Sequence, residues 1–194
     1  MVLITAAMVL SAAAQAQSSN VSGAASGSSW YNPSGSRYFG LNVGRSNYAG
    51  NCGLGAFTCE DTATAYNVYS GSMWNKNVGL ELGLADFGKI DRNGGTTKAY
   101  GFSAKAVGVM PLSESVSGFA KLGTLFGKTK VTADSGSGVA TGSDDGWGAS
   151  YGLGLSLDIT PQLAGVLEWE QSHMKFAGNR DHINFTSVGL KYRF

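Results

Sequence analysis

The chain has 194 residues, 14% of them charged, a formal net charge of +1, 29 glycines and only 3 prolines. A mean hydropathy of −0.03 is too low for a bundle of membrane helices and too high for a disordered chain, and the length suits one folded domain. Lysines and arginines are scattered singly, so the charge pattern does not favour a nucleic-acid partner.

The first sixteen residues are predicted to be an export signal. Residues 2–14 are mainly small and apolar, and Ala14, Gln15 and Ala16 form an A-x-A cleavage site. The positively charged start of such signals is missing, which leaves the true start of the signal open, and an ordinary buried helix is the alternative. Residues 17–36 are rich in Ser and Gly, so we expect a flexible lead-in before a folded domain over residues 37–194.

From residue 37 onward, apolar residues alternate with polar or small ones in eight segments. In one of them Leu80 and Leu82 share one face, whereas Glu81 and Gly83 share the other. This period of two predicts β-strands with one apolar face each. The expected strands cover residues 38–45, 64–74, 78–87, 98–110, 116–127, 149–159, 163–171 and 183–194.

Short and long connections alternate between these strands. We expect short turns at residues 75–77, 111–115 and 160–162, and long polar loops at residues 46–61, 88–97, 128–146 and 172–181. Bacterial outer-membrane barrels have an even number of strands, short periplasmic turns and long outer loops. The sequence therefore predicts an all-β, eight-stranded, antiparallel up-and-down transmembrane β-barrel in the outer membrane, exported through the periplasm.

Aromatic residues near the predicted strand ends are expected to form girdles at the two membrane interfaces. They are Tyr38, Trp74, Trp147, Tyr151, Tyr192 and Phe194.

The two cysteines, Cys52 and Cys59, lie in the first predicted loop. The oxidising periplasm favours a disulfide between them over a pair of free thiols. A metal site would need further ligands close by, and none is evident in the sequence, so no metal or cofactor is expected.

Three segments resemble the OmpA-like transmembrane-domain family of small outer-membrane barrels: residues 75–83 (NKNVGLELG), 119–123 (FAKLG) and 188–194 (VGLKYRF). The resemblance covers about residues 37–194. It implies that Val188, Leu190, Tyr192 and Phe194 form the signal read by the outer-membrane assembly machinery, although they could also be lipid-facing residues only. Full-length relatives often continue into a peptidoglycan-binding domain, and for this chain we expect the barrel alone.

An eight-stranded barrel has a lumen just wide enough to be filled by side chains, so we expect a polar core and no broad pore. An unpaired ion there would cost several kcal/mol, which favours a balanced charge network. We expect Glu81, Lys105 and Lys121 to lie together, with Glu168 as the best candidate for a further anion. The predicted inward charges, four of each sign, are Glu81, Lys105, Lys121, Asp158, Glu168, Glu170, Lys191 and Arg193.

Three functional classes fit such a barrel. The favoured one is a structural and surface-interaction protein, which contacts outer-membrane lipid and lipopolysaccharide and binds an extracellular ligand through its loops. The alternative is a narrow, porin-like ion channel. A lipid A-modifying enzyme is less favoured, because Ser172 and His173 are adjacent and would point to opposite faces of a continuous strand, and His173 and His182 are expected in a surface loop. No catalytic residue is therefore predicted.

Overall fold

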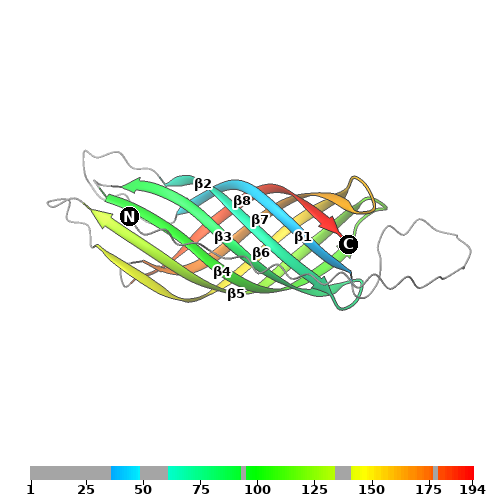
Figure 1. Ribbon diagram of the computed structural model, residues 1–194, viewed down its shortest axis with the longest axis horizontal. Coiled ribbons are helices and arrows are strands. Elements are labelled where there is room, and N and C mark those ends of the chain that lie inside the picture. Colours follow the sequence, from blue (N-terminus) through cyan, green and yellow to red (C-terminus); the bar gives the residue numbers. More distant parts are fainter. Residues whose placement is uncertain (1–35, 49–60, 93–94, 134–140, 177–178) are drawn as a thin grey trace, which may run out of the picture.

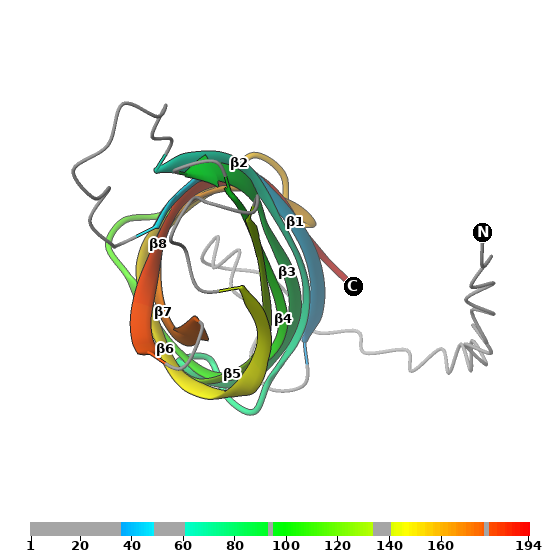
Figure 2. The same cartoon turned by 90° about the vertical axis from the view of Figure 1, so that its left-hand side faces the viewer.

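The computed structural model describes residues 36–48, 61–92, 95–133, 141–176 and 179–194. Within these ranges eight antiparallel strands form a closed barrel, in which each strand pairs with its neighbours in sequence and β1 pairs with β8 (Figures 1 and 2). The predicted fold class is confirmed. The strands are β1 (Arg37–Tyr48), β2 (Thr62–Met73), β3 (Val78–Arg92), β4 (Gly95–Pro111), β5 (Val116–Ala133), β6 (Gly142–Asp158), β7 (Leu163–Phe176) and β8 (Asn179–Arg193).

The N-terminal segments and the two cysteines fall outside the described residues, so the signal peptide, the lead-in and the disulfide stay predictions. No helix in the described ranges is long and apolar enough to cross a membrane.

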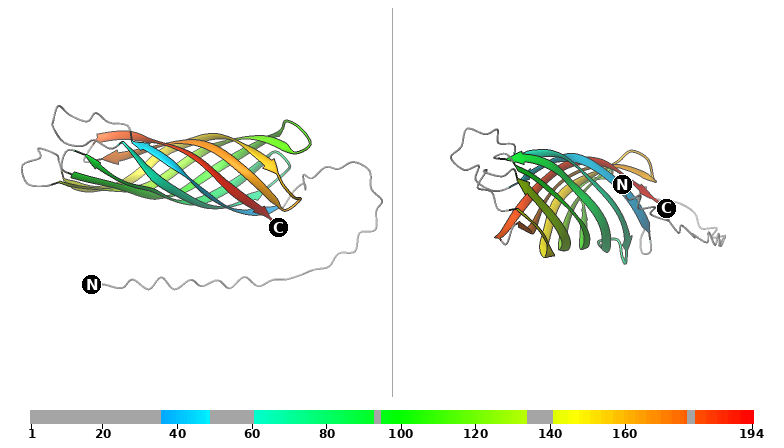
Figure 3. Two further views of the ribbon diagram at one scale, coloured as in Figure 1. Left: turned by 90° about the horizontal axis from the view of Figure 1, so that it is seen from above. Right: turned by 60° about the vertical axis from the view of Figure 1, so that its left-hand side comes forward.

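The alternation of side chains along each strand builds the wall of the barrel. Leu82 and Leu84 are exposed on the outside, whereas Glu81 and Gly83 are buried on the lumen side. This arrangement places apolar side chains against lipid and polar or small ones inside. The strands are strongly tilted against the long axis of the barrel (Figure 3), as closure of a small barrel requires.

Two inward glycines make room for lumen tyrosines. A Cβ atom at Gly40 would collide with the ring of Tyr69, and one at Gly71 would collide with the ring of Tyr38. Tyr38 is therefore buried in the lumen and is not a girdle residue, which corrects the prediction. The other aromatics predicted for the girdles have partly or largely exposed side chains, namely Trp74, Trp147, Tyr151, Tyr192 and Phe194.

The three predicted short turns are present, and they lie at the same end of the barrel as the C-terminus (Figure 1). In the first turn the Asn75 side chain accepts hydrogen bonds from the backbone N–H groups of Asn77 and Val78, at 2.9 and 2.8 Å. In barrels of this kind the short turns face the periplasm. We call this the short-turn end and the opposite one the outer end.

Three of the four predicted long loops are wrong in extent, because the strands continue through much of them. The ladders reach Arg92↔Gly95, Val131↔Gly142 and Phe176↔Asn179. Near the outer end outward positions are polar, as at Lys128 and Lys130, so hydrophobic alternation disappears while backbone pairing continues. The first loop is close to its prediction, since β1 ends at Tyr48 and β2 begins at Thr62.

A β-bulge interrupts β3 between Asp86 and Lys89. Gly88 has a φ of 80°, a conformation that favours glycine, and its N–H donates to the Asp86 carboxylate at 2.9 Å. The extra residue changes the alternation, so that Phe87 and Ile90, three positions apart, are both buried.

Candidate functional site in the barrel lumen

Side chains that face inward divide the lumen into three levels: an apolar cluster near the outer end, a charged plug in the middle and a cavity at the short-turn end. Each level has contributions from several strands, so closure of the barrel assembles all three.

The apolar cluster fills the outer part of the lumen and corrects the expectation of a polar core throughout. The rings of Phe87 and Phe185 meet edge to face, with centroids 6.3 Å apart. Beyond the area that they bury, such ring pairs contribute about 0.5 to 1.5 kcal/mol. The cluster consists of Tyr48, Ala65, Phe87, Ile90, Ala99, Leu125, Met174, Ile183 and Phe185.

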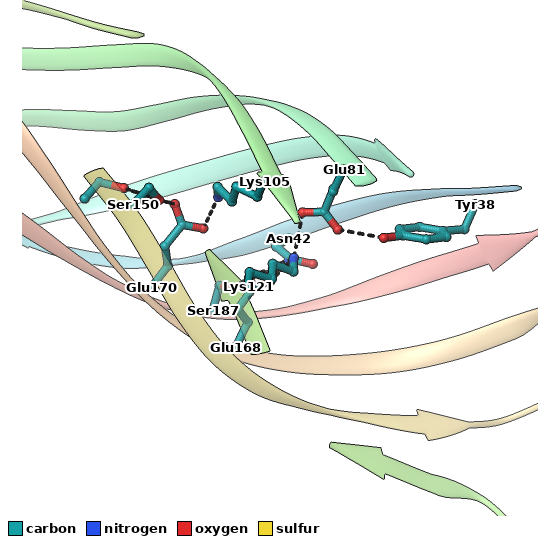
Figure 4. Close-up of polar contacts among 10 residues, drawn as sticks. Tyr38, Asn42, Glu81, Lys105, Lys121, Ser150, Glu168, Glu170 and Ser187 are labelled. Atoms are coloured by element: carbon teal, nitrogen blue, oxygen red, sulfur yellow. Dashed lines mark hydrogen bonds and ion pairs between the residues drawn. The ribbon is translucent and has the colours of Figure 1, made fainter. Parts of the chain in front are cut away.

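The charged plug lies on the short-turn side of this cluster, in the middle of the barrel. It comprises five buried residues, Glu81, Lys105, Lys121, Glu168 and Glu170 (Figure 4). At its centre, Lys121 Nζ lies 2.7 Å from Glu81 Oε1 and 2.8 and 3.0 Å from the two carboxylate oxygens of Glu168. One ammonium group thus bridges two carboxylates from different strands.

Neutral groups complete the first half of the plug. The Tyr38 hydroxyl donates to Glu81 Oε2 at 3.1 Å, and Asn42 Nδ2 donates to Glu168 Oε2 at 2.9 Å. Lys121 Nζ also lies 4.5 Å from the centroid of the Tyr69 ring, within cation–π range. These contacts provide the hydrogen bonds that a buried ion pair needs to offset its desolvation.

The second half of the plug is the pair Lys105–Glu170, with 2.5 Å between Nζ and Oε2. The other oxygen of Glu170 accepts hydrogen bonds from the hydroxyls of Ser150 and Ser172, at 2.9 and 3.0 Å. The plug therefore holds three carboxylates and two ammonium groups in direct contact.

The register explains part of this arrangement. Glu81 stands opposite Lys105 in the β3–β4 ladder, yet the ammonium of Lys105 contacts Glu170 of β7. Of the predicted group, the structure brings Glu81, Lys121 and Glu168 together and gives Lys105 a different partner.

Sequence reasoning missed the neutral partners of the plug. Tyr38, Asn42, Ser150 and Ser172 all occupy inward positions of their strands. The alternation places Asn42 and Ser150 on the polar faces of their predicted strands, but Tyr38 was expected in a girdle and Ser172 in a loop. Without the depth of each residue in the barrel, the sequence did not identify any of the four as a hydrogen-bond partner.

The remaining predicted charges lie apart from the plug, at the short-turn end. Arg193 Nη2 donates to Asp158 Oδ1 at 2.7 Å. Lys191 Nζ lies 5.6 Å from the ring centroid of Tyr38 and 5.8 Å from that of Phe119. Both cations line a cavity of about 660 Å³.

The two histidines lie within strands, not in a loop as expected. His173 of β7 is paired with His182 of β8, and their ring centroids are 6.0 Å apart. Ser172 is fully buried on the lumen side, where its hydroxyl donates to Glu170. Because β7 continues through both positions, Ser172 and His173 point to opposite faces and cannot act as a nucleophile and its base.

The alternate residues at the end of β8 face outward. The predicted assembly signal comprises Val188, Leu190, Tyr192 and Phe194, all of them exposed.

Comparisons with known proteins agree with this architecture. The family model described as "Outer membrane protein beta-barrel domain" matches residues 2–194. Outer membrane protein A of Salmonella typhi is 26% identical over 135 residues, which are 65% of this chain and 39% of that protein. The chain thus matches well under half the length of this curated relative.

Solved structures share the fold at low sequence identity. Ail of Yersinia pestis, in complex with the heparin analogue sucrose octasulfate, is 20% identical with a TM-score of 0.55, over 83% of this chain and 99% of Ail. Neisserial surface protein A is 13% identical with a TM-score of 0.62, over 81% of this chain and 97% of that one. Together with the match of the family model, the closed barrel identifies this chain as a member of the outer membrane protein beta-barrel domain family, located in the bacterial outer membrane.

Proposed function

We propose that this protein is a closed barrel that anchors a binding surface at the outer face of the membrane, with a structural and surface-interaction role. The observation that carries the proposal is the double closure of the lumen by the charged plug and the apolar cluster. A conducting path would have to open both levels.

The plug is costly to open because its ions are desolvated and paired. Lys121 has 3% of its side chain exposed and contacts both Glu81 and Glu168. Separating these ions while they stay buried would leave charges without partners, which is strongly unfavourable. This supports a stable scaffold over a steadily conducting channel.

Exposed lysines near the outer end support contact with anionic lipid. Lys98 and Lys130 stand opposite each other on β4 and β5, and Lys128 stands opposite Tyr100. These outward positions continue the apolar outer face formed by residues such as Phe102 and Phe126. Basic side chains at the edge of an apolar band attract anionic head groups, which makes the phosphates of lipopolysaccharide the proposed partner.

The outer loops are the proposed site for an extracellular ligand. The two longest connections between strands, residues 49–61 and 134–141, join β1 to β2 and β5 to β6 at the end opposite the short turns, and connecting segments on a rigid scaffold commonly carry binding residues. The complex of Ail with a sulfated sugar makes a polyanion the first class to test. We do not propose an enzyme, because the one adjacent serine and histidine point to opposite faces of β7.

The alternating residues that end at Phe194 are the proposed recognition signal for the outer-membrane assembly machinery. Their outward exposure leaves them accessible to a partner before insertion and to lipid afterwards.

Single-channel recording in a planar bilayer tests the scaffold proposal. We expect little or brief conductance for the wild-type protein, and deletion of its gene should weaken the envelope or surface binding. Long-lived conductance that changes on substitution of Lys121 would favour the channel alternative. Altered acylation of lipid A, seen by mass spectrometry in cells with and without the protein, would favour an enzyme.

A further inference from the structure

The cavity at the short-turn end has properties that the closed scaffold does not require. Its volume of about 660 Å³ lies in the range of pockets that bind small molecules, about 300 to 1,000 Å³. Tyr38, Tyr69, Glu81 and Lys121 line it on the side of the plug, and Pro161 of a short turn lines it at the opposite side. It is therefore a blind pocket that faces the periplasmic side.

Two cationic side chains of this pocket have unused donors. Lys191 makes no hydrogen bond or ion pair within the described ranges, and its ammonium approaches only the rings of Tyr38 and Phe119. Arg193 uses Nη2 for Asp158, whereas its Nη1 atom is buried without a hydrogen-bond partner in the described part of the chain. A buried donor without a partner is uncommon, so Arg193 Nη1, together with the half-buried ammonium of Lys191 in the same pocket, indicates a missing acceptor.

The rest of the wall is largely apolar. Met73, Val107, Val109 and Phe119 line the pocket from β2, β4 and β5. A ligand that satisfies both parts of the wall combines one anionic group with an apolar body.

We propose that this pocket binds a small amphipathic monocarboxylate that enters from the short-turn side. Its carboxylate contacts Lys191 and Arg193, and its apolar body packs against Val107, Val109 and Phe119. Because the plug closes the pocket on the other side, this is a binding site and not a passage.

A simpler account is that Lys191 only balances the plug, which holds one carboxylate more than ammonium groups. That account predicts no preference of the pocket for anions. The two accounts therefore differ in a measurable property.

The test uses the protein in phospholipid nanodiscs and the probe 4-phenylbutyrate, with its neutral analogue 4-phenylbutyramide as the matched ligand. NMR titration follows the backbone amides of residues near the pocket, such as Ser117 and Gln162. We expect the carboxylate to bind about tenfold more tightly than the amide, the factor that corresponds to 1.4 kcal/mol of added charge-assisted bonding.

Two variants make the result decisive, each checked for folding by heat-modifiable migration in gels. Lys191→Gln should remove the preference for the carboxylate, and Val109→Trp should fill the pocket and abolish binding of both probes with Lys191 intact. Lys89→Gln, at a lysine that is 58% exposed near the outer end, is the charge-matched control and should bind as the wild type does. Equal binding of acid and amide to the wild type, or unchanged acid binding by Lys191→Gln or Val109→Trp, would overturn the proposal.

Discussion

Substitution of Lys121 in the plug should lower the stability of the barrel strongly, because its ammonium group neutralises two carboxylates at once. Lys121→Met removes the ammonium that lies 2.7 Å from Glu81 and 2.8 Å from Glu168. Both carboxylates are then left in a confined site without a direct counter-charge. Breaking a buried pair from one side costs about 3 to 5 kcal/mol, so the free energy of unfolding should fall by at least about 3 kcal/mol.

Glu81→Gln should cost less, because Lys121 keeps Glu168. The loss is that of a hydrogen bond to a charged group, about 1.5 to 3 kcal/mol. Lys128→Met removes an exposed outward lysine and should stay within about 0.5 kcal/mol. The order Lys121 > Glu81 > Lys128 follows from the number of buried partners that each change leaves uncompensated.

The assay is equilibrium urea unfolding of the barrel in phospholipid vesicles, followed by tryptophan fluorescence. A triple variant, Lys121→Met with Glu81→Gln and Glu168→Gln, removes the unpaired charges and should recover much of the loss, since neutral replacement of a buried ionic group is often tolerated. If Lys121→Met unfolds like Lys128→Met, or if the triple variant is no more stable than Lys121→Met, the ionic account of the plug is wrong.

Three further predictions concern assembly, oxidation and packing. Deletion of Phe194, which is 69% exposed at the end of the chain, should lower the amount of heat-modifiable protein in the outer membrane and raise periplasmic degradation; normal levels would contradict the assembly role. Thiol labelling of the oxidised wild-type protein should find neither Cys52 nor Cys59 reactive, and a Cys52→Ser barrel should still fold. Gly71→Ala forces a Cβ into a lumen tyrosine ring and should cost about 1 to 3 kcal/mol in urea unfolding, whereas Gly108→Ala, where nothing lies closer than 4.0 Å, should cost little; equal effects would contradict the packing argument.

The membrane-spanning parts of the strands were predictable because lipid imposes a strict alternation on them. Leu82 and Leu84 face outward and Glu81 faces inward, as the period of two requires. Nearer the outer end the strands no longer face the apolar part of the lipid, so their outward side chains need not be apolar. The strand segments there show no hydrophobic alternation, and the sequence predicted them as loops. The bulge at Gly88 shifts the alternation by one residue, so the period of two did not predict that Ile90 faces the lumen. The apolar cluster that contains Ile90 was therefore not predicted either.

The partners within the plug depend on geometry that alternation does not contain. The alternation of side chains along each strand determines that Lys105 and Glu170 both face the lumen. Their strands, β4 and β7, are however not neighbours in the barrel wall. Whether two such side chains meet depends on strand tilt and stagger, which set the depth of each residue. Lys105 therefore reaches across the lumen to Glu170 and not to Glu81 beside it, which leaves Lys121 to bridge two carboxylates. The same geometry places Lys191 on the short-turn side of the plug, beside the rings of Tyr38 and Phe119 and without a carboxylate partner in the described residues. The proposed pocket could therefore be recognised from the structure but not from the sequence.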